Sequence, residues 1–147
     1  MALPDVLAER CVHGIIDIAS CSACVDACPR GAWVLDEDLL GILPDVCDGC
    51  GLCAAACPQG AIRIELEPLF LQDGARRVAA MACERAQGVS GAPGQVPCLH
   101  AVGAGDVLAL CRSGVDGFLL AAGECERCSR GQGEGLLQRL ERVNGML

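Results

Sequence analysis

Large aromatic side chains are almost absent from this chain of 147 residues, which has one Trp, two Phe and no Tyr. Small domains with so few large apolar anchors usually need cross-links to be stable. The chain also contains 13 cysteines. We therefore expect the cysteines to supply these cross-links, either as disulfides or as bonds to metal.

We expect neither a membrane span nor a secretory leader. No stretch reaches about 18 consecutive apolar residues, the length at which a membrane helix is indicated. Residues 1–10 carry Asp5 and Glu9 in place of the apolar segment of a signal peptide. The odd number of cysteines, spaced at two-residue gaps, argues against a secreted disulfide scaffold. These features predict a reducing, cytoplasmic location.

Positive charge is in deficit, since the formal net charge is −8. An acidic surface disfavours nucleic acid and suits docking on a basic patch of a partner protein, although such charge also simply keeps proteins soluble. A Gly-x-Gly-x-x-Gly fingerprint is missing as well, because Gly103-Ala104-Gly105 lacks the third glycine. The sequence therefore gives no support for flavin or nicotinamide binding.

The densest motif is Cys47-x2-Cys50-x2-Cys53-x3-Cys57-Pro58. This spacing is typical of a chain wrapped around a cubic iron–sulfur cluster, with the fourth cysteine bound to a neighbouring cluster. Because such a cluster carries its own redox chemistry, the motif predicts a role in electron transfer.

The N-terminal half contains a repeat at an offset of 29 residues. Three pairs align at this offset: Cys21 with Cys50, Cys24 with Cys53, and Cys28-Pro29 with Cys57-Pro58. Each copy predicts a short helical turn that the proline ends, because proline cannot donate to the helix ladder. A Gly-Ala turn and a short apolar strand follow, at residues 33–35 and 62–64.

Over about residues 11–66 this repeat resembles the bacterial two-cluster ferredoxin family. In that family the first three cysteines of one motif share a cluster with the last cysteine of the other. The resemblance implies two [4Fe–4S] clusters. One, called site 1 here, would include Cys21, Cys24 and Cys57. The other, site 2, would be held by Cys28, Cys47, Cys50 and Cys53.

Site 1 departs from the family pattern, because Ile18 stands at the position that aligns with Cys47. Cys11 could supply the missing ligand, since residues 12–20 form a loop long enough to fold back. His13 could bind iron instead, or the site could hold a [3Fe–4S] cluster with no fourth ligand. We favour Cys11, since a lone cysteine beside an incomplete site would otherwise be a coincidence, and interpret His13 as a loop residue.

Two other metal chemistries use cysteine patterns similar to those of this half. A structural zinc site needs two cysteine pairs, whereas here the cysteines occur in triplets that end at Cys-Pro. A radical enzyme with Cys-x3-Cys-x2-Cys would need further cysteines where Gly31 and Gly60 stand. Both patterns fit less well than a pair of iron–sulfur clusters.

The second half predicts strands that alternate with helices. Apolar runs suggest strands at residues 77–83, 95–98 and 115–122, while helices are expected from the Gly105-Asp106 turn to Gly114, with Asp106 as N-cap, and at about 134–143. This alternation implies a small parallel sheet. Four cysteines lie at or just beyond its predicted carboxyl edge, where ligands collect in open α/β sheets. These residues, site 3, are Cys83, Cys98, Cys125 and Cys128, and they suit a [2Fe–2S] cluster.

Residues 76–145 also resemble the delta subunit of methyl-viologen-reducing hydrogenases. The likeness is carried by Val96-Pro97-Cys98, by residues 115–120 and by Gly123-Glu124-Cys125-Glu126-Arg127-Cys128. That family often has a further cysteine where this chain has Ala86. The resemblance implies electron transfer to a larger enzyme such as a heterodisulfide reductase.

Other interpretations of these residues remain. Cys125 and Cys128 could form a dithiol redox pair, although Cys83 and Cys98 would then be unexplained. Cys111 is interpreted as a small apolar residue inside a helix. His100 could be a ligand, but a supporting role beside the site is favoured.

Together these observations predict an α+β ferredoxin-like domain with two clusters at residues 1–66, a linker at 67–76, and a small α/β domain with a short parallel sheet at 77–147. The expected function is that of a non-enzymatic carrier or subunit that relays electrons through two [4Fe–4S] clusters and one [2Fe–2S] cluster. The expected partner is a larger hydrogenase, heterodisulfide-reductase-like or molybdenum enzyme. The alternative is a cluster-binding maturation factor or redox sensor.

Overall fold

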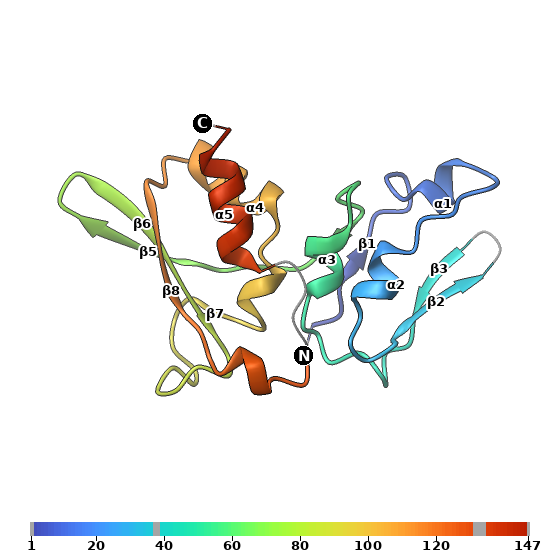
Figure 1. Cartoon of the computed structure of the whole chain (residues 1–147), viewed down its shortest axis with the longest axis horizontal. Coiled ribbons are helices and arrows are strands. Elements are labelled where there is room, and N and C mark those ends of the chain that lie inside the picture. Colours follow the sequence, from blue (N-terminus) through green and yellow to red (C-terminus); the bar gives the residue numbers. More distant parts are fainter. Residues whose placement is uncertain (1, 37–38, 131–134, 147) are drawn as a thin grey trace.

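The computed structural model describes residues 2–36, 39–130 and 135–146. The chain forms two lobes side by side along its long axis (Figure 1). The N-terminal lobe holds β1 (Asp5–Val6), α1 (Val12–Ile15), α2 (Ala23–Ala27), β2 (Trp33–Asp36), β3 (Leu39–Ile42), α3 (Leu52–Ala56) and β4 (Ile62–Arg63). The C-terminal lobe holds β5 (Leu69–Asp73), β6 (Arg76–Cys83), β7 (Gln95–Val96), η1 (Leu99–Ala101), α4 (Ala104–Arg112), β8 (Gly117–Ala121), η2 (Cys125–Arg127) and α5 (Leu136–Asn144).

The predicted repeat is present in the N-terminal lobe. Helices α2 and α3 lie 29 residues apart, and each ends at the cysteine before a proline, Cys28 and Cys57. Gly31 and Gly60 follow with φ of 64° and 58°, a left-handed conformation that favours glycine. The predicted strands at 33–35 and 62–64 correspond to β2 and β4. The repeat therefore holds at the level of backbone conformation as well as of sequence.

Two short antiparallel ribbons complete this lobe. Strand β1 pairs with β4, and β2 pairs with β3. The buried cluster between the ribbons and helices is small, and it consists of Cys24, Trp33, Cys53 and Ile62. Because two of its four members are predicted iron ligands, side chains alone provide little core for this lobe.

The C-terminal lobe is built on β6, which is hydrogen-bonded along both edges. Strand β8 runs parallel to β6 on one edge, while β5, antiparallel, and β7, parallel, follow one another along the other. The sheet is therefore mixed. The parallel arrangement of three strands was predicted, but the antiparallel strand β5 was not.

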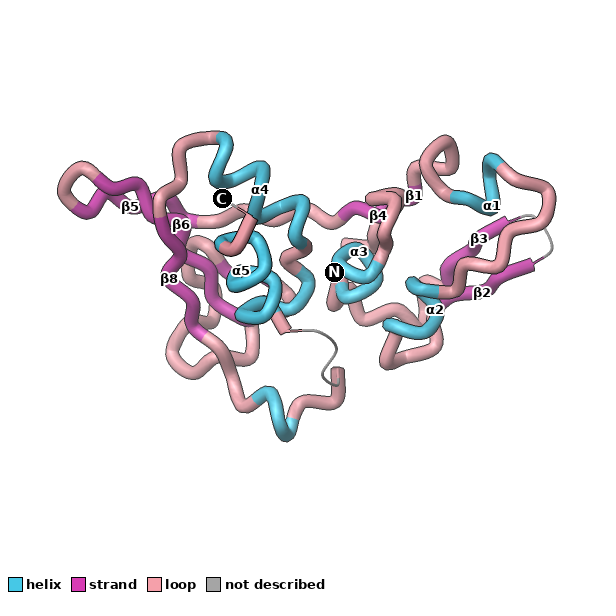
Figure 2. The backbone as a smooth tube through the Cα atoms, turned by 45° about the horizontal axis from the view of Figure 1, so that its top comes forward, coloured by secondary structure: helices cyan, strands magenta, loops and turns pink. Residues whose placement is uncertain are grey.

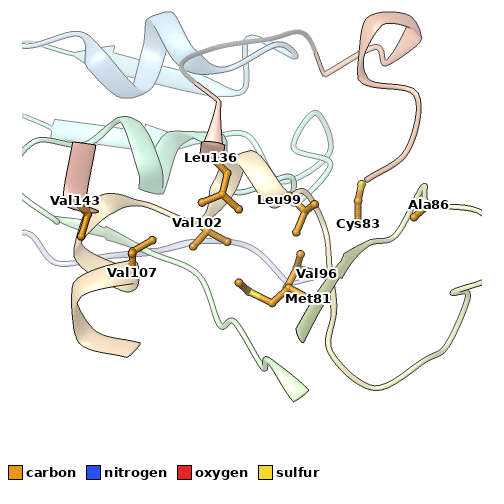
Figure 3. Packing of buried hydrophobic residues seen from close by; sticks show 9 residues of the cluster. All are labelled: Met81, Cys83, Ala86, Val96, Leu99, Val102, Val107, Leu136 and Val143. Carbon is orange, nitrogen blue, oxygen red and sulfur yellow. The ribbon is translucent and has the colours of Figure 1, made fainter. Parts of the chain in front are cut away.

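Helices α4 and α5 lie on one face of this sheet (Figure 1). Figure 3 shows the buried hydrophobic cluster of this lobe, with Val107 and Val143 at one end and Cys83 and Ala86 at the other. Leu119, whose neighbours Phe118 and Leu120 pack against this core, lies on the opposite face and is 59% exposed. The site 3 cysteine Cys83 is thus fixed at the edge of the main core.

Two predicted elements need correction. Residues 67–76, expected to be an irregular linker, contain β5, whose backbone pairs with β6 from Leu69 to Asp73. Helix α4 begins one turn earlier than expected, with Gly103 as N-cap. Asp106 lies at the third helical position, where its carboxylate accepts a 2.8 Å hydrogen bond from Gly103 N–H. Helix α5 begins at Leu136, and the predicted start at residue 134 lies outside the described residues.

The two lobes meet where α3 faces η1. Figures 1 and 2 both show α3 as the helix of the N-terminal lobe nearest to the C-terminal lobe. Leu52 and Ala101 belong to one buried cluster at this contact, together with Cys50 and Cys98. We call this cluster the seam.

Candidate iron–sulfur sites

The two Cys-Pro cysteines have matching surroundings. Ala32 N–H donates to Cys28 Sγ and Ala61 N–H donates to Cys57 Sγ, both at 3.3 Å. Both alanines are fully buried, at 0% and 1% exposure. An N–H donor aimed at sulfur stabilises the thiolate form and tunes a bound cluster. The repeat therefore provides each predicted cluster with the same donor.

All four residues predicted for site 1 line one small apolar cavity of about 20 Å³. They are Cys11, Cys21, Cys24 and Cys57. Cys11, the residue just before α1, lies at the wall of this cavity. Burial is the largest effect on Cys24 and raises the pKa of its thiol, and the nearby Cys57 and Cys21 sulfurs act in the same direction. The donor set at this cavity fits an iron–sulfur cluster.

His13 lines the same cavity, but its ring is already engaged. The Nε2 atom lies 2.7 Å from the carbonyl oxygen of Cys21. A carbonyl can only accept, so Nε2–H is the donor and Nε2 is not available to iron. This bond ties α1 to the cysteine loop, so His13, predicted to be a loop residue, is instead a half-buried residue of α1.

Three of the four site 2 cysteines lie near enough to one another to interact electrostatically. The Cys53 thiol interacts electrostatically with Cys28 and Cys47 and accepts a hydrogen bond from the side chain of Trp33. Gly49 N–H donates to Cys47 Sγ at 3.4 Å. Burial raises the pKa of the Cys53 thiol to about 11.

Cys50, the fourth residue predicted for site 2, packs into the seam with Leu52 and Ala101. Burial raises the pKa of its thiol to about 12, more than any other effect on it. Cys50 is thus placed between the site 2 segment and the C-terminal lobe. No contact in the described residues joins its sulfur directly to Cys28, Cys47 or Cys53.

The site 3 cysteines line a single cavity of about 690 Å³ at the carboxyl edge of β6, β7 and β8. They are Cys83, Cys98, Cys125 and Cys128. Burial is the largest effect on Cys98 and raises the pKa of its thiol, with smaller contributions from Cys83 and Cys128. The four predicted thiols therefore line one cavity at this edge, and their chemistry fits a [2Fe–2S] cluster.

Polar groups surround these thiols. Arg85 Nη1 donates to Cys128 Sγ at 3.5 Å and to Ser129 Oγ at 3.2 Å. His100 lines the cavity, and its Nδ1 accepts a hydrogen bond from Leu136 N–H at the start of α5. Burial, followed by the charge of Arg139, lowers the pKa of His100. His100 therefore links the cavity wall to α5 through one ring nitrogen.

Two observations complete the inventory of cysteines. Among residues 2–36, 39–130 and 135–146 no group of three His, Cys, Asp or Glu side chains is arranged to hold a single metal ion. Cys111, the thirteenth cysteine, lies in α4 and packs against the core of the C-terminal lobe, as predicted.

Two residues near the predicted sites were not found by sequence analysis. The side chain of Trp33 reaches the Cys53 sulfur from β2, and only the fold places these residues together. Arg130 is 6% exposed and pairs with Asp48 at 3.1 Å and Glu84 at 2.7 Å. The sequence around Arg130 does not predict these ion pairs, because Asp48 and Glu84 are 82 and 46 residues away from Arg130 in sequence.

Comparison with known families matches residues 40–63 to the 4Fe-4S binding domain. The match covers the motif of Cys47, Cys50, Cys53 and Cys57. It supports a ferredoxin-type iron–sulfur domain with at least one [4Fe–4S] cluster, the kind of domain that is typical of electron carriers. Neither the curated proteins nor the solved structures that were compared gave a match to this chain.

In the part of the chain that the structure describes, no helix has the length and apolar character needed to cross a bilayer.

Proposed function

We propose that this protein is an electron carrier with three iron–sulfur centres: [4Fe–4S] clusters at sites 1 and 2 and a [2Fe–2S] cluster at site 3. The observation that carries the proposal is that two separate cavities are each lined by four cysteines, those of site 1 and those of site 3. The match of the site 2 motif to 4Fe-4S binding domains supports the remaining centre.

Local structure supports a role in carrying electrons. Backbone N–H donors face the sulfurs of Cys28, Cys47 and Cys57, and such donors would stabilise the added charge of a reduced cluster. Cys24, Cys53 and Cys83 are buried, which restricts access of water to the sulfurs. Burial and N–H donors of this kind are the means by which proteins set cluster potentials.

The iron content tests the proposal directly. Anaerobically purified protein is expected to contain about ten irons and ten acid-labile sulfides, from clusters of four, four and two irons. Cys24→Ser, Cys53→Ser and Cys98→Ser should each remove or convert one centre, which low-temperature EPR at several potentials would detect as the loss of one signal.

Cys111→Ser is the matched control, because Cys111 belongs to none of the three sites. It should retain the iron content and all EPR signals of the wild type. A colourless preparation, or equal effects of Cys111→Ser and Cys53→Ser on the iron content, would overturn the proposal.

The proposed partner is a larger redox enzyme of the hydrogenase, heterodisulfide-reductase-like or molybdenum type. This part rests on the resemblance of residues 76–145 to a hydrogenase delta subunit and on the acidic surface. Anaerobic co-purification from the native cell, followed by mass spectrometry, should recover such an enzyme. Recovery of the lone chain would contradict a role as a permanent subunit.

A further inference from the structure

Sites 2 and 3 approach one another at the seam. Cys50, predicted for site 2, and Cys98, predicted for site 3, belong to the same buried cluster with Leu52 and Ala101. Both cysteines are nearly fully buried, at 7% and 6% exposure. One ligand of each predicted centre therefore lies in a single water-poor contact between the lobes.

The apolar part of this contact is small. Leu52 and Ala101 are small or medium-sized, and among the described residues one further apolar side chain, Ile64, packs against the cluster. A seam of this size provides little apolar burial. Polar contacts that cross the seam are therefore important for its geometry.

Arg130 makes the polar contacts across the seam. Its Nε and Nη2 atoms reach the N-terminal lobe at the carboxylate and the carbonyl oxygen of Asp48, at 3.1 and 3.5 Å. Nη2 also pairs with Glu84 at 2.7 Å, and Nη1 donates to the carbonyl oxygen of Pro97. Glu84 follows Cys83 directly, and Pro97 precedes Cys98. A single planar side chain thus joins the loop of Cys47 and Cys50 to the loops of Cys83 and Cys98.

The guanidinium group of Arg130 also places a positive charge near both site 2 and site 3. Its positive charge acts on the Cys50 thiol and on the Cys98 thiol. A buried ion pair contributes little net stability, because desolvation offsets most of the Coulomb attraction, but it specifies geometry. The planar fork of arginine suits this use better than lysine, and all 11 basic residues of the chain are arginine.

We propose that Arg130 is a positioning residue for electron transfer, which holds Cys50 and Cys98 together at the seam and makes this contact the junction between the centres of sites 2 and 3. The inference rests on the proposed function. Passage of an electron across the junction oxidises one centre by one electron and reduces the other by one, with no transfer of atoms, and the redox partner supplies or removes that electron.

The experiment compares Arg130→Gln with Arg127→Gln in the full-length, iron-loaded protein. Arg127 lines the same cavity, but its side chain is 84% exposed and it pairs only with the neighbouring Glu124 among the contacts described. The two variants lose the same charge, and only one of them loses the contacts across the seam. The readouts are EPR-monitored redox titration and the magnetic interaction between the two reduced centres.

Loss of the Arg130 charge should make sites 2 and 3 harder to reduce by about tenfold in equilibrium constant, which for a one-electron couple is a fall of about 59 mV. The magnetic splitting between them should weaken. Site 1, which has no described contact with Arg130, should change less than about twofold and serves as an internal control. Arg127→Gln should leave the splitting unchanged.

Arg130→Lys separates charge from geometry. It should keep both potentials near those of the wild type but weaken the splitting, because one ammonium group cannot bridge Asp48, Glu84 and Pro97. Wild-type splitting in Arg130→Lys would overturn the positioning role. Equal magnetic splitting in Arg130→Gln and Arg127→Gln would overturn it too.

If Arg130→Gln does not retain iron, Asp48→Asn replaces it, with the exposed Asp45→Asn as control. Asp48→Asn removes the ion pair that crosses the seam while Arg130 and Glu84 stay paired, so it should weaken the splitting, and unchanged splitting would overturn the inference. Failure of the proposed function is distinguishable from these results, because it would appear in the wild type as missing iron or missing EPR signals.

Discussion

Gly51 offers the sharpest test of how the seam is packed. It lies between Cys50 and α3 with φ of 76°, and a Cβ atom there would overlap Ile64 Cδ1 and approach Ala101 Cβ to 3.0 Å. Gly51→Ala should therefore incur two costs. The left-handed backbone costs about 1 kcal/mol for alanine, and overpacking adds about 1–3 kcal/mol. The methyl group of Ile64 can rotate away, whereas Ala101 is fixed by η1, so the second cost should not vanish.

Gly74→Ala is the matched control, because Gly74 has a similar φ of 62° and nothing within 4 Å of its would-be Cβ. It should carry only the backbone cost. For a chain of this size about 1 kcal/mol corresponds to 2–4 °C in the midpoint of thermal unfolding. We expect a fall of about 2–4 °C for Gly74→Ala and about 4–16 °C for Gly51→Ala, measured anaerobically by circular dichroism at one scan rate. Equal midpoints for the two variants would refute the packing of the lobes described here.

Three further outcomes are expected. Met81→Ala should lower stability by about 2–5 kcal/mol because Met81 is fully buried, whereas Leu119→Ala, on the open face of the sheet, should change it by less than about 0.5 kcal/mol; denaturant unfolding checks both. Chelation of iron should speed amide exchange in β2 and β3 well before it does so in β6, because the N-terminal lobe has the smaller apolar core. Hydrogen exchange with mass spectrometry measures this, and loss of protection in all three strands together would contradict it. Metal uptake by chelated protein should release protons and strengthen from pH 7 to 9. Burial raises the pKa values of Cys50 and Cys53 to about 12 and 11, and their thiols must lose a proton to bind metal. Uptake that does not vary with pH would contradict these shifts.

Much of the N-terminal lobe was predictable because its signals are local. The repeat at 29 residues, the prolines after Cys28 and Cys57 and the glycines at 31 and 60 each dictate backbone conformation within a few residues. The structure has the same helices, turns and strands at these positions. The position of Cys11 at the site 1 cavity followed from the incomplete motif together with the length of the loop.

The misses share a different physical origin. Strand β5 was interpreted as a linker because Pro68, Gln72 and Gly74 are typical of turns. Its strand conformation depends on pairing with β6, and all five of its residues are exposed, so apolar patterning could not reveal it. The ion pairs of Arg130 join segments far apart in sequence, and no spacing rule applies to such contacts. Cys50 was assigned by spacing to site 2, but spacing gave no indication that it also packs against the C-terminal lobe.

The pairing of β5 with β6 bears on any attempt to study the C-terminal half alone. A fragment cut at residue 77, where the predicted α/β domain begins, would lose Leu69–Asp73 and expose the backbone hydrogen-bonding groups that β6 uses to bind β5. Bare strand edges of this kind recruit other chains and promote aggregation. A fragment that starts upstream of residue 69 would keep its own edge strand and should remain monomeric, whereas the shorter one should precipitate or form oligomers.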